Sequence, residues 1–246
     1  MKIYLAGSGS EKLLKPRNFY DFNKLDSFLT IKDVNAELIP KYKSFILDSG
    51  AFTYLNGAKT NINWDDYVTK YANFINKYNI KNYIEMDIDP IIGLKEVERL
   101  RYKLEKLTGK QSIPVWHKSR GKDYWIKMCK EYRYIAIGGI VTKEIKSTEY
   151  KYFHYMLKVA HDNNCKVHGL GFTNMKGLKE YKFDSVDSTS WLSGNKFGHI
   201  YKFNGETLLK FDKKPGQRVK SHITAMNNFR EWVKFANYME KNDIIR

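Results

Sequence analysis

Cysteine and long apolar runs are scarce in this chain of 246 residues, and each scarcity excludes a class of protein. The two cysteines, Cys129 and Cys165, stand alone without CxxC spacing, so neither a disulfide scaffold nor a cysteine-rich zinc site is expected. Residues 1–15 hold too short an apolar run for a signal peptide, and no window approaches a membrane span. We therefore expect a cytoplasmic protein in a reducing compartment, with no membrane partner.

Acidic residues are also few relative to basic ones. Lys and Arg number 43 against 27 Asp and Glu, which gives a formal net charge of +16. A charge of this size favours a polyanionic partner through steering and counterion release, and the 15% of aromatic residues fits an enzyme that acts on nucleic acid. The alternative is a solvated surface in a chain biased towards Lys, Asn, Ile and Tyr. Because the basic residues lie all along the chain, the sequence does not locate a binding patch.

Hydrophobic strands alternate with helices along most of the chain. Strands are expected at residues 2–6, 44–47, 82–86, 113–116, 134–137, 166–170 and 184–187. Amphipathic helices are expected between them, for example at 64–78 behind Asn63 as the N-cap, whereas residues 19–29 read as loosely helical. Seven or so strand-helix units predict an α/β fold, a (β/α)8 TIM-type barrel of regular or irregular form.

The C-terminal part departs from this rhythm. Residues 199–211 alternate around Asn204 and Gly205 and predict a β-hairpin with a tight turn, and an apolar stripe over residues 223–239 predicts a final helix. We therefore expect one domain over residues 1–246. Its barrel core would occupy about residues 1–191, and residues 192–246 would form a hairpin and helix elaboration.

Polar residues and glycines follow the predicted strands at the point where each strand ends. In a parallel barrel the carboxyl ends of the strands meet at one rim. The residues at these ends are Asp48, Asp87, His117, Gly138, Gly139, Gly169, Gly171 and Asp187. Taken singly, each carboxylate could be a turn residue or a helix cap, His117 a structural histidine, and the glycine pair a close-packed turn. Three carboxylates on one rim favour an active site.

Carboxylates that share a pocket have different pKa values, so one can stay ionised while another carries a proton. Such a set suits substitution at an anomeric carbon, where a facing carboxylate stabilises the transition state and can bond covalently. A metal site is the rival use of His117 and the aspartates, but no HxH or HxxxH spacing supports it, so no metal is expected. The Gly/Ser loop at residues 7–10 lacks P-loop and GxGxxG spacing and reads as a turn rather than a phosphate loop.

Short motifs at these strand ends occur in a fixed order: ILDSGAF at 46–52, EMDIDP at 85–90, VWHKS at 115–119, AIGGI at 136–140, HGLGF at 168–172, FDSVDSTSW at 183–191 and SGNKFGHIYKFNG at 193–205. Together they resemble the guanine transglycosylases, which exchange a guanine in nucleic acid for a 7-deazaguanine. The first is similar to that family's DSGGF/Y strand end, the second to its second acid, the fourth to its GGL and the fifth to its MGVG segment. The last two resemble the segment of its nucleophilic Asp and its NGHLF hairpin, while VWHKS stands where the family has a Gln-Gly pair. The likeness covers roughly residues 44–210.

The resemblance implies a mechanism. Asp187 would attack the sugar C1′ and hold the nucleic acid covalently, and Asp48 would be the general base or proton shuttle. Asp87 would read the Watson-Crick edge of the purine, with His117 in place of the family's Gln and with main-chain groups of the glycine pair. The implied base-binding residues are Asp87, His117, Gly138, Gly139, Gly169, Ser49 and Gly50. A base such as 7-cyano-7-deazaguanine would then attack the same carbon, with net retention and no cofactor.

The chain departs from the tRNA-modifying members of that family. Their zinc site, a CxCxxC followed by a His, has no counterpart because no cysteine follows Asp187, so zinc is expected to be absent. The chain is also much shorter and is more similar to the compact, phage-type members that modify DNA. DNA is therefore the favoured partner and tRNA the nearest alternative, in the host cytoplasm for a phage protein.

Two alternatives from other classes stay open. One is a catalytically silent, basic nucleic-acid-binding barrel, and the other is a carboxylate-dependent N-glycoside hydrolase. Three acids at the rim disfavour the binder, because they repel phosphate. The oligomeric state and the sequence context of the target guanine do not follow from the sequence.

Overall fold

The computed structural model describes residues 1–7, 20–50, 53–54, 62–193, 197–213, 216 and 220–244. Most of the Gly/Ser loop, residues 8–10, and the motif residues Ala51 and Phe52 lie outside this set. In the described part, no helix is both long enough and apolar enough to span a membrane.

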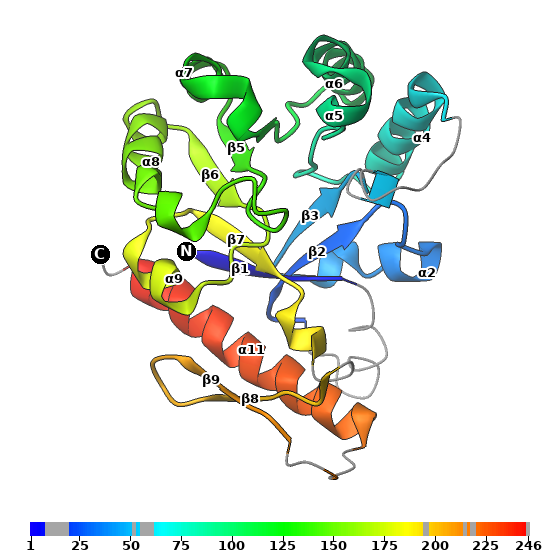
Figure 1. The fold of residues 1–246 in the computed structure, drawn as a ribbon. Coiled ribbons are helices and arrows are strands. Elements are labelled where there is room, and N and C mark those ends of the chain that lie inside the picture. Colours follow the sequence, from blue (N-terminus) through cyan, green and yellow to red (C-terminus); the bar gives the residue numbers. More distant parts are fainter. Residues whose placement is uncertain are drawn as a thin grey trace.

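A curled parallel sheet forms the centre of the molecule, with its strands in the order β3-β2-β1-β7-β6-β5-β4 (Figure 1). Its strands are β1 (Lys2–Ala6), β2 (Asn23–Ser27), β3 (Ser44–Asp48), β4 (Val115–Trp116), β5 (Tyr134–Ile137), β6 (Lys166–Gly169) and β7 (Ser185–Ser188). β1 pairs with both β2 and β7, so the first and last strands of the series are neighbours. This mixed α/β architecture confirms the predicted α/β class.

The two edges of the sheet approach each other through residues 82–85. Isolated parallel bridges join Leu47 to Tyr83 and Ile84 to Ile113. The Ile84 N–H donates to the Leu47 carbonyl at 2.9 Å, and the Ile113 N–H donates to the Tyr83 carbonyl at 2.8 Å. Residues 82–86 were predicted as a full strand. The structure shows only these bridges there.

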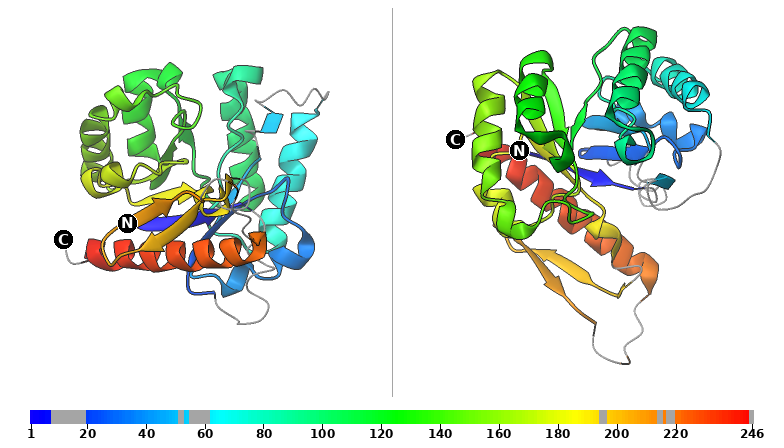
Figure 2. Two further views of the ribbon diagram at one scale, coloured as in Figure 1. Left: turned by 60° about the horizontal axis from the view of Figure 1, so that its bottom comes forward. Right: turned by 45° about the horizontal axis from the view of Figure 1, so that its top comes forward.

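Helices surround the convex side of the sheet (Figures 1 and 2). They are α2 (Asp33–Ala36), α4 (Trp64–Lys77), α5 (Asp89–Ile92), α6 (Leu94–Thr108), α7 (Gly121–Glu131), α8 (Tyr152–Asp162) and α9 (Met175–Glu180), with 3-10 turns η1 (Ile39–Lys41), η2 (Lys118–Arg120), η3 (Ser147–Glu149) and η4 (Ser190–Leu192). The predicted cap of α4 is confirmed, since the Asn63 side chain accepts a hydrogen bond from the Asp66 N–H at 3.1 Å. Tyr71 on α4 places its hydroxyl 3.0 Å from the Leu47 and Ile84 carbonyls and so holds the bridged segment against β3.

The predicted hairpin and final helix are confirmed as β8 (Ile200–Phe203), β9 (Leu208–Phe211) and α11 (Ser221–Ile244). α11 packs against β1, η4 and β8. The buried Asn228 of α11 accepts from the Tyr201 N–H and donates to the His199 carbonyl, both at 2.9 Å. These bonds fix the start of the hairpin to α11, and Figure 2 shows the hairpin and the helix side by side.

Two apolar clusters divide the core between the faces of the sheet. The larger one lies between the strands and the helices. The smaller one is formed by side chains of alternate strand residues that point away from the helices: Tyr4, Ala6, Leu25, Ile46, Ile84, Ile113, Val115 and Ala136. Side chains that continue this inner face beyond the strand ends therefore enter one common space.

Residues 19–29 correct the sequence interpretation. They were expected to be loosely helical, but residues 23–27 form β2. Lys24 and Asp26 face the same side and form a buried ion pair, with 2.5 Å between Nζ and Oδ1, and the ammonium group also donates to the Gly7 carbonyl at 2.6 Å. Two charged residues inside a five-residue strand conceal the alternation of apolar and polar residues that marks a strand. The strand forms because its neighbours pair with it in the folded sheet.

Candidate active site

Asp48 lies at the carboxyl end of β3, on the same face as Ile46. Its Oδ2 accepts a hydrogen bond from the Gly50 N–H at 3.0 Å, and Gly50 has a φ of +83° that glycine adopts readily. Burial, helped by the negative charges of Asp87 and Asp187, outweighs the backbone hydrogen bonds and raises the pKa of Asp48 to about 6. The carboxyl group therefore titrates near neutral pH, as a proton shuttle requires.

Asp87 is held in place by ion pairs on both sides of it in the chain. Glu85 is completely buried. Its carboxylate accepts hydrogen bonds from Arg120 Nη1 and Arg101 Nη1, each at 3.0 Å, and from the Val115 N–H at 2.7 Å. The Asp89 carboxylate accepts a bidentate pair of hydrogen bonds from Arg120, at 2.9 and 3.0 Å. Arg120 thus clamps the residues before and after Asp87 and fixes the direction in which that carboxylate points.

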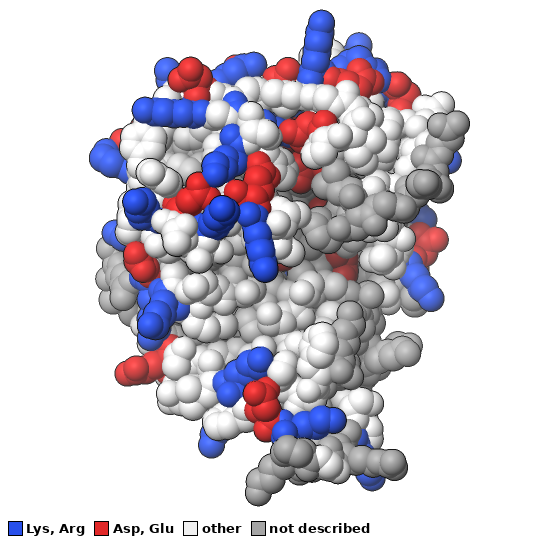
Figure 3. All heavy atoms as spheres, viewed as in Figure 1, with Lys and Arg blue, Asp and Glu red and all other residues white. Residues whose placement is uncertain are grey.

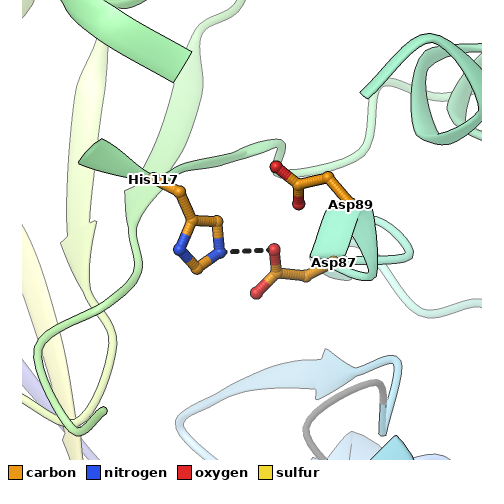
Figure 4. Close-up of side chains that lie close together, drawn as sticks. All are labelled: Asp87, Asp89 and His117. Carbon is orange, nitrogen blue, oxygen red and sulfur yellow. Dashed lines mark hydrogen bonds and ion pairs between the residues drawn. The ribbon is translucent and has the colours of Figure 1, made fainter. Parts of the chain in front are cut away.

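His117 follows β4 and lies between two carboxylates (Figure 4). Its Nε2 is 2.6 Å from Asp87 Oδ1, and its Nδ1 is 2.9 Å from Glu144 Oε2. Burial alone would lower the pKa of His117, but the hydrogen bond and charge of Asp87, the hydrogen bond of Glu144 and the charge of Asp89 raise it to about 9. At neutral pH the ring is an imidazolium that donates to both carboxylates.

The glycine pair after β5 leaves room for this histidine. A Cβ atom on Gly138 would lie 2.7 Å from His117 Cε1 and 2.8 Å from Val115 Cγ1. Gly139 has a φ of +77°, and a Cβ there would lie 2.6 Å from Glu144 Oε2. Side chains at these two positions would displace the imidazole and its carboxylate partner, so both glycines belong to the wall of the site.

Asp187 is a buried residue of β7. Its Oδ1 accepts the Gly171 N–H at 2.7 Å and lies 3.2 Å from His168 Nε2. Gly171 has a φ of +65°, which turns the chain after β6 so that its N–H points at the carboxylate. The carboxylate of Asp187 is therefore bound to the backbone and to a histidine on the neighbouring strand.

The structure brings together most of the residues that the sequence singled out. Asp48, Asp87 and Asp187 lie close enough that the charges of the last two raise the pKa of the first. His117 contacts Asp87, and Gly138 contacts His117.

Three predicted base-binding residues, Gly169, Ser49 and Gly50, make contacts other than those predicted for them. A Cβ on Gly169 would meet the rings of Phe172 and Phe183, so this glycine faces the core between strand and helix. Ser49 is buried and its carbonyl accepts from the Tyr67 hydroxyl at 2.6 Å. Gly50 serves the site through its N–H to Asp48.

One group in the described part has the composition of a metal site. Ligand atoms of Asp87, Asp89 and His117 lie within 4.8 Å of one another. Both oxygens of Asp89 accept hydrogen bonds from Arg120, and His117 Nε2 is hydrogen bonded to Asp87 Oδ1. In this structure the three groups take part in a charged hydrogen-bond network.

Sequence reasoning missed Glu144, Arg120 and His168. Glu144 lies in the loop after β5, where the sequence has no recognisable motif. Arg120 does not belong to a predicted apolar stripe or strand end. His168 stood inside the HGLGF motif, and its position two residues before the end of a predicted strand placed it on the inner face. The strand period alone therefore indicated that His168 lies on the same face as the site residues.

The surface around the site carries mixed charge. Figure 3 shows acidic atoms in the middle of the upper half of this face, with Lys and Arg side chains to the left of them and above them. Basic side chains near the rim include Lys118, which pairs with Glu149 at 2.6 Å, and Lys122 over the Tyr155 ring at 5.0 Å. Acidic groups with basic side chains near them suit a substrate whose reacting part is not its phosphate.

Comparison with known protein families and with curated proteins finds no match to this chain.

Proposed function

We propose that this chain is a guanine transglycosylase that replaces guanine in nucleic acid with a 7-deazaguanine base through a covalent Asp187 intermediate. The observation that carries the proposal is that three carboxylates from separate strand ends, Asp48, Asp87 and Asp187, lie within range of one another's charge, with burial as the main cause that raises the pKa of Asp48 to about 6. A hydrolytic or exchanging reaction at a glycosidic carbon requires such a set, with one group ionised and one exchanging a proton. The order of the motifs favours exchange.

The proposal includes a (β/α)8 barrel as the scaffold. The bridges of residues 83 and 84 to β3 and to Ile113 support residues 82–86 as the strand that completes the ring. In such a barrel the strand ends share one rim, which explains how residues from 48 to 187 in the chain reach one pocket.

The chemistry follows from the roles of two carboxylates. Asp187 attacks C1′ of the target nucleotide; the bond to guanine N9 breaks, and its electron pair leaves with the base. Asp48, in its protonated form, supplies a proton to the leaving guanine. The incoming 7-deazaguanine returns a proton to Asp48 as its N9 attacks C1′ and releases Asp187. Two displacements retain the configuration, and no cofactor enters the balance.

The base is read by the network around His117. The imidazolium holds Oδ1 of Asp87, and Oδ2 would accept from the N1–H and amino group of a guanine edge. In the glycine pair, the Gly138 N–H donates to the Trp116 carbonyl and the Gly139 carbonyl accepts from the Ile145 N–H, so the Gly138 carbonyl and the Gly139 N–H are the groups proposed to contact the base. A 7-deazaguanine such as 7-cyano-7-deazaguanine presents the same donors and therefore fits the same contacts.

DNA is the proposed polymer, with tRNA as the second candidate. The net charge of +16 suits either one. DNA is favoured because the chain lacks the cysteines of the zinc site found in the tRNA-modifying enzymes that it resembles.

The test follows labelled 7-cyano-7-deazaguanine into duplex DNA, single-stranded DNA and tRNA. Wild type should incorporate label into one polymer and form a denaturation-resistant adduct with it, and Asp187→Asn should do neither while still binding. Asp162→Asn, a surface change beside Lys158, is the matched control. Absence of label from every polymer, with no adduct, would overturn the proposal. Release of guanine without incorporation would identify a hydrolase instead.

A further inference from the structure

A chain of hydrogen bonds runs from Asp187 into the interior of the sheet. His168, which has no exposed surface, lies on β6 with Nε2 3.2 Å from Asp187 Oδ1 and Nδ1 2.6 Å from Ser185 Oγ. Ser185 Oγ is also hydrogen bonded to the Tyr134 hydroxyl. Three side chains from β5, β6 and β7 thus form one line that leads to the carboxylate of Asp187.

The donors in this line have one consistent direction. An ionised carboxylate only accepts, so His168 Nε2 carries the hydrogen in the bond to Asp187. Nδ1 can then accept from the Ser185 hydroxyl, and Ser185 can accept from Tyr134. Burial raises the pKa of Tyr134 well above its ordinary value, so this hydroxyl keeps its hydrogen and donates. Every hydrogen in the line points towards Asp187.

The ring of His168 has little freedom to turn away. Tyr4 stands edge-on to it at 5.9 Å between centroids, and Tyr134 stands edge-on at 6.4 Å. These rings come from strands on opposite sides of β6 in the curled sheet. The imidazole is therefore fixed by packing as well as by its two hydrogen bonds.

Both hydrogen bonds to Asp187 fall on the same oxygen. Oδ1 receives the Gly171 N–H and His168 Nε2, whereas no partner for Oδ2 is found in the described part of the chain. An attacking carboxylate needs one oxygen with a free lone pair aimed at the reacting carbon. The arrangement selects Oδ2 for that role.

We propose that His168 is a positioning residue for Asp187, held in its Nε2–H form by Ser185 and Tyr134, so that Oδ1 is anchored and Oδ2 is presented for attack. The catalytic part of this inference rests on the proposed transglycosylase function. The structural part, the tautomer and its dependence on neighbours, does not. The two parts can therefore fail separately.

Nitrogen-15 NMR of the histidine rings tests the structural part. His168→Gln identifies the resonances by removing them. In wild type they should show a protonated Nε2 and an unprotonated Nδ1. Ser185→Ala should shift Nδ1, and Asp187→Asn should shift Nε2. A ring protonated on Nδ1 alone, or nitrogens unmoved by both substitutions, would overturn the inference whether or not the protein is a transglycosylase.

Adduct kinetics tests the catalytic part. His168→Leu, which fills the space but cannot donate, should slow adduct formation by about 100-fold, because a nucleophile misplaced by about 1 Å loses that much, with nucleic-acid affinity nearly unchanged. His168→Gln can still donate to Oδ1 and should recover part of the rate. His161→Gln, on an exposed histidine beside Asp184, is the control and should match wild type. Equal rates for Leu, Gln and wild type would overturn the positioning role. If wild type forms no adduct, the proposed function fails and the NMR result still decides the inference.

Discussion

At the scale of single residues, the folded protein disfavours the ionised form of the Asp48 carboxyl group. Its pKa in the folded protein is about 6, above the ordinary value for Asp, so the folded state binds a proton that the unfolded chain has already released. The stability that this group contributes is complete below about pH 4 and is lost as the pH rises through 6. Above that range, ionised Asp48 costs roughly 3 kcal/mol.

Asp48→Asn should therefore stabilise the protein in neutral solution while abolishing base exchange. Asparagine keeps the acceptor for the Gly50 N–H but cannot ionise, so the free energy of unfolding should exceed that of wild type by up to roughly 3 kcal/mol near pH 7.5. The gain should fade towards about pH 4. Urea unfolding of both proteins across this range measures it, with the surface change Asp66→Asn as the control. A difference that does not vary with pH would contradict the raised pKa.

At the scale of elements, Arg120 and Glu85 join three parts of the chain. Glu85 follows the bridged residues 83 and 84, Arg120 ends η2, and Arg101 lies on α6. Because Asp87 is between the two carboxylates that Arg120 binds, the cluster both supports the fold and aims a site residue. A buried ion pair of this kind adds little against an apolar core, but an unpaired member is costly.

Glu85→Gln should destabilise the protein by about 3–5 kcal/mol, since it leaves Arg101 and part of Arg120 buried without their counter-charge. Glu96→Gln offers a matched control, because Glu96 also pairs with an arginine, Arg99, but at the exposed surface. Urea unfolding near neutral pH compares the two. Equal midpoints for the two variants would show that burial does not give the Glu85 pairs their importance.

Elements with a clear period were predictable from the sequence, and those specified by distant partners were not. α4 followed from its apolar face and its Asn63 cap, and β3 from an apolar run ending in Asp48. β2 was missed because Lys24 and Asp26 neutralise each other only in the folded core. Likewise the position of Asp87 was predictable from its strand, whereas its contact through His117 to Glu144 depends on a loop without a motif.

At the scale of the whole molecule, the charge of the candidate site is opposite in sign to the net charge of the chain. The candidate site gathers Asp48, Asp87 and Asp187, while the chain as a whole has a formal charge of +16. Phosphates are repelled by the first and attracted by the second. For the proposed function, a polymer would bind by its phosphates away from the three carboxylates, and only a nucleotide sugar and its base would approach them.

Affinity for nucleic acid should accordingly fall steeply with salt. If about six phosphates are contacted, the binding constant should drop by about 1,000-fold between about 50 and 200 mM salt. Fluorescence anisotropy with Asp187→Asn, which binds without turnover, measures this for duplex DNA, single-stranded DNA and tRNA, and the tightest binder at the higher salt is the expected substrate. An oligonucleotide with an uncharged methylphosphonate backbone is the control and should bind weakly at every salt concentration. Affinity that is insensitive to salt would mean that the positive charge does not contact a polymer, and the three carboxylates would then be better explained by hydrolysis of a small nucleoside than by exchange in DNA.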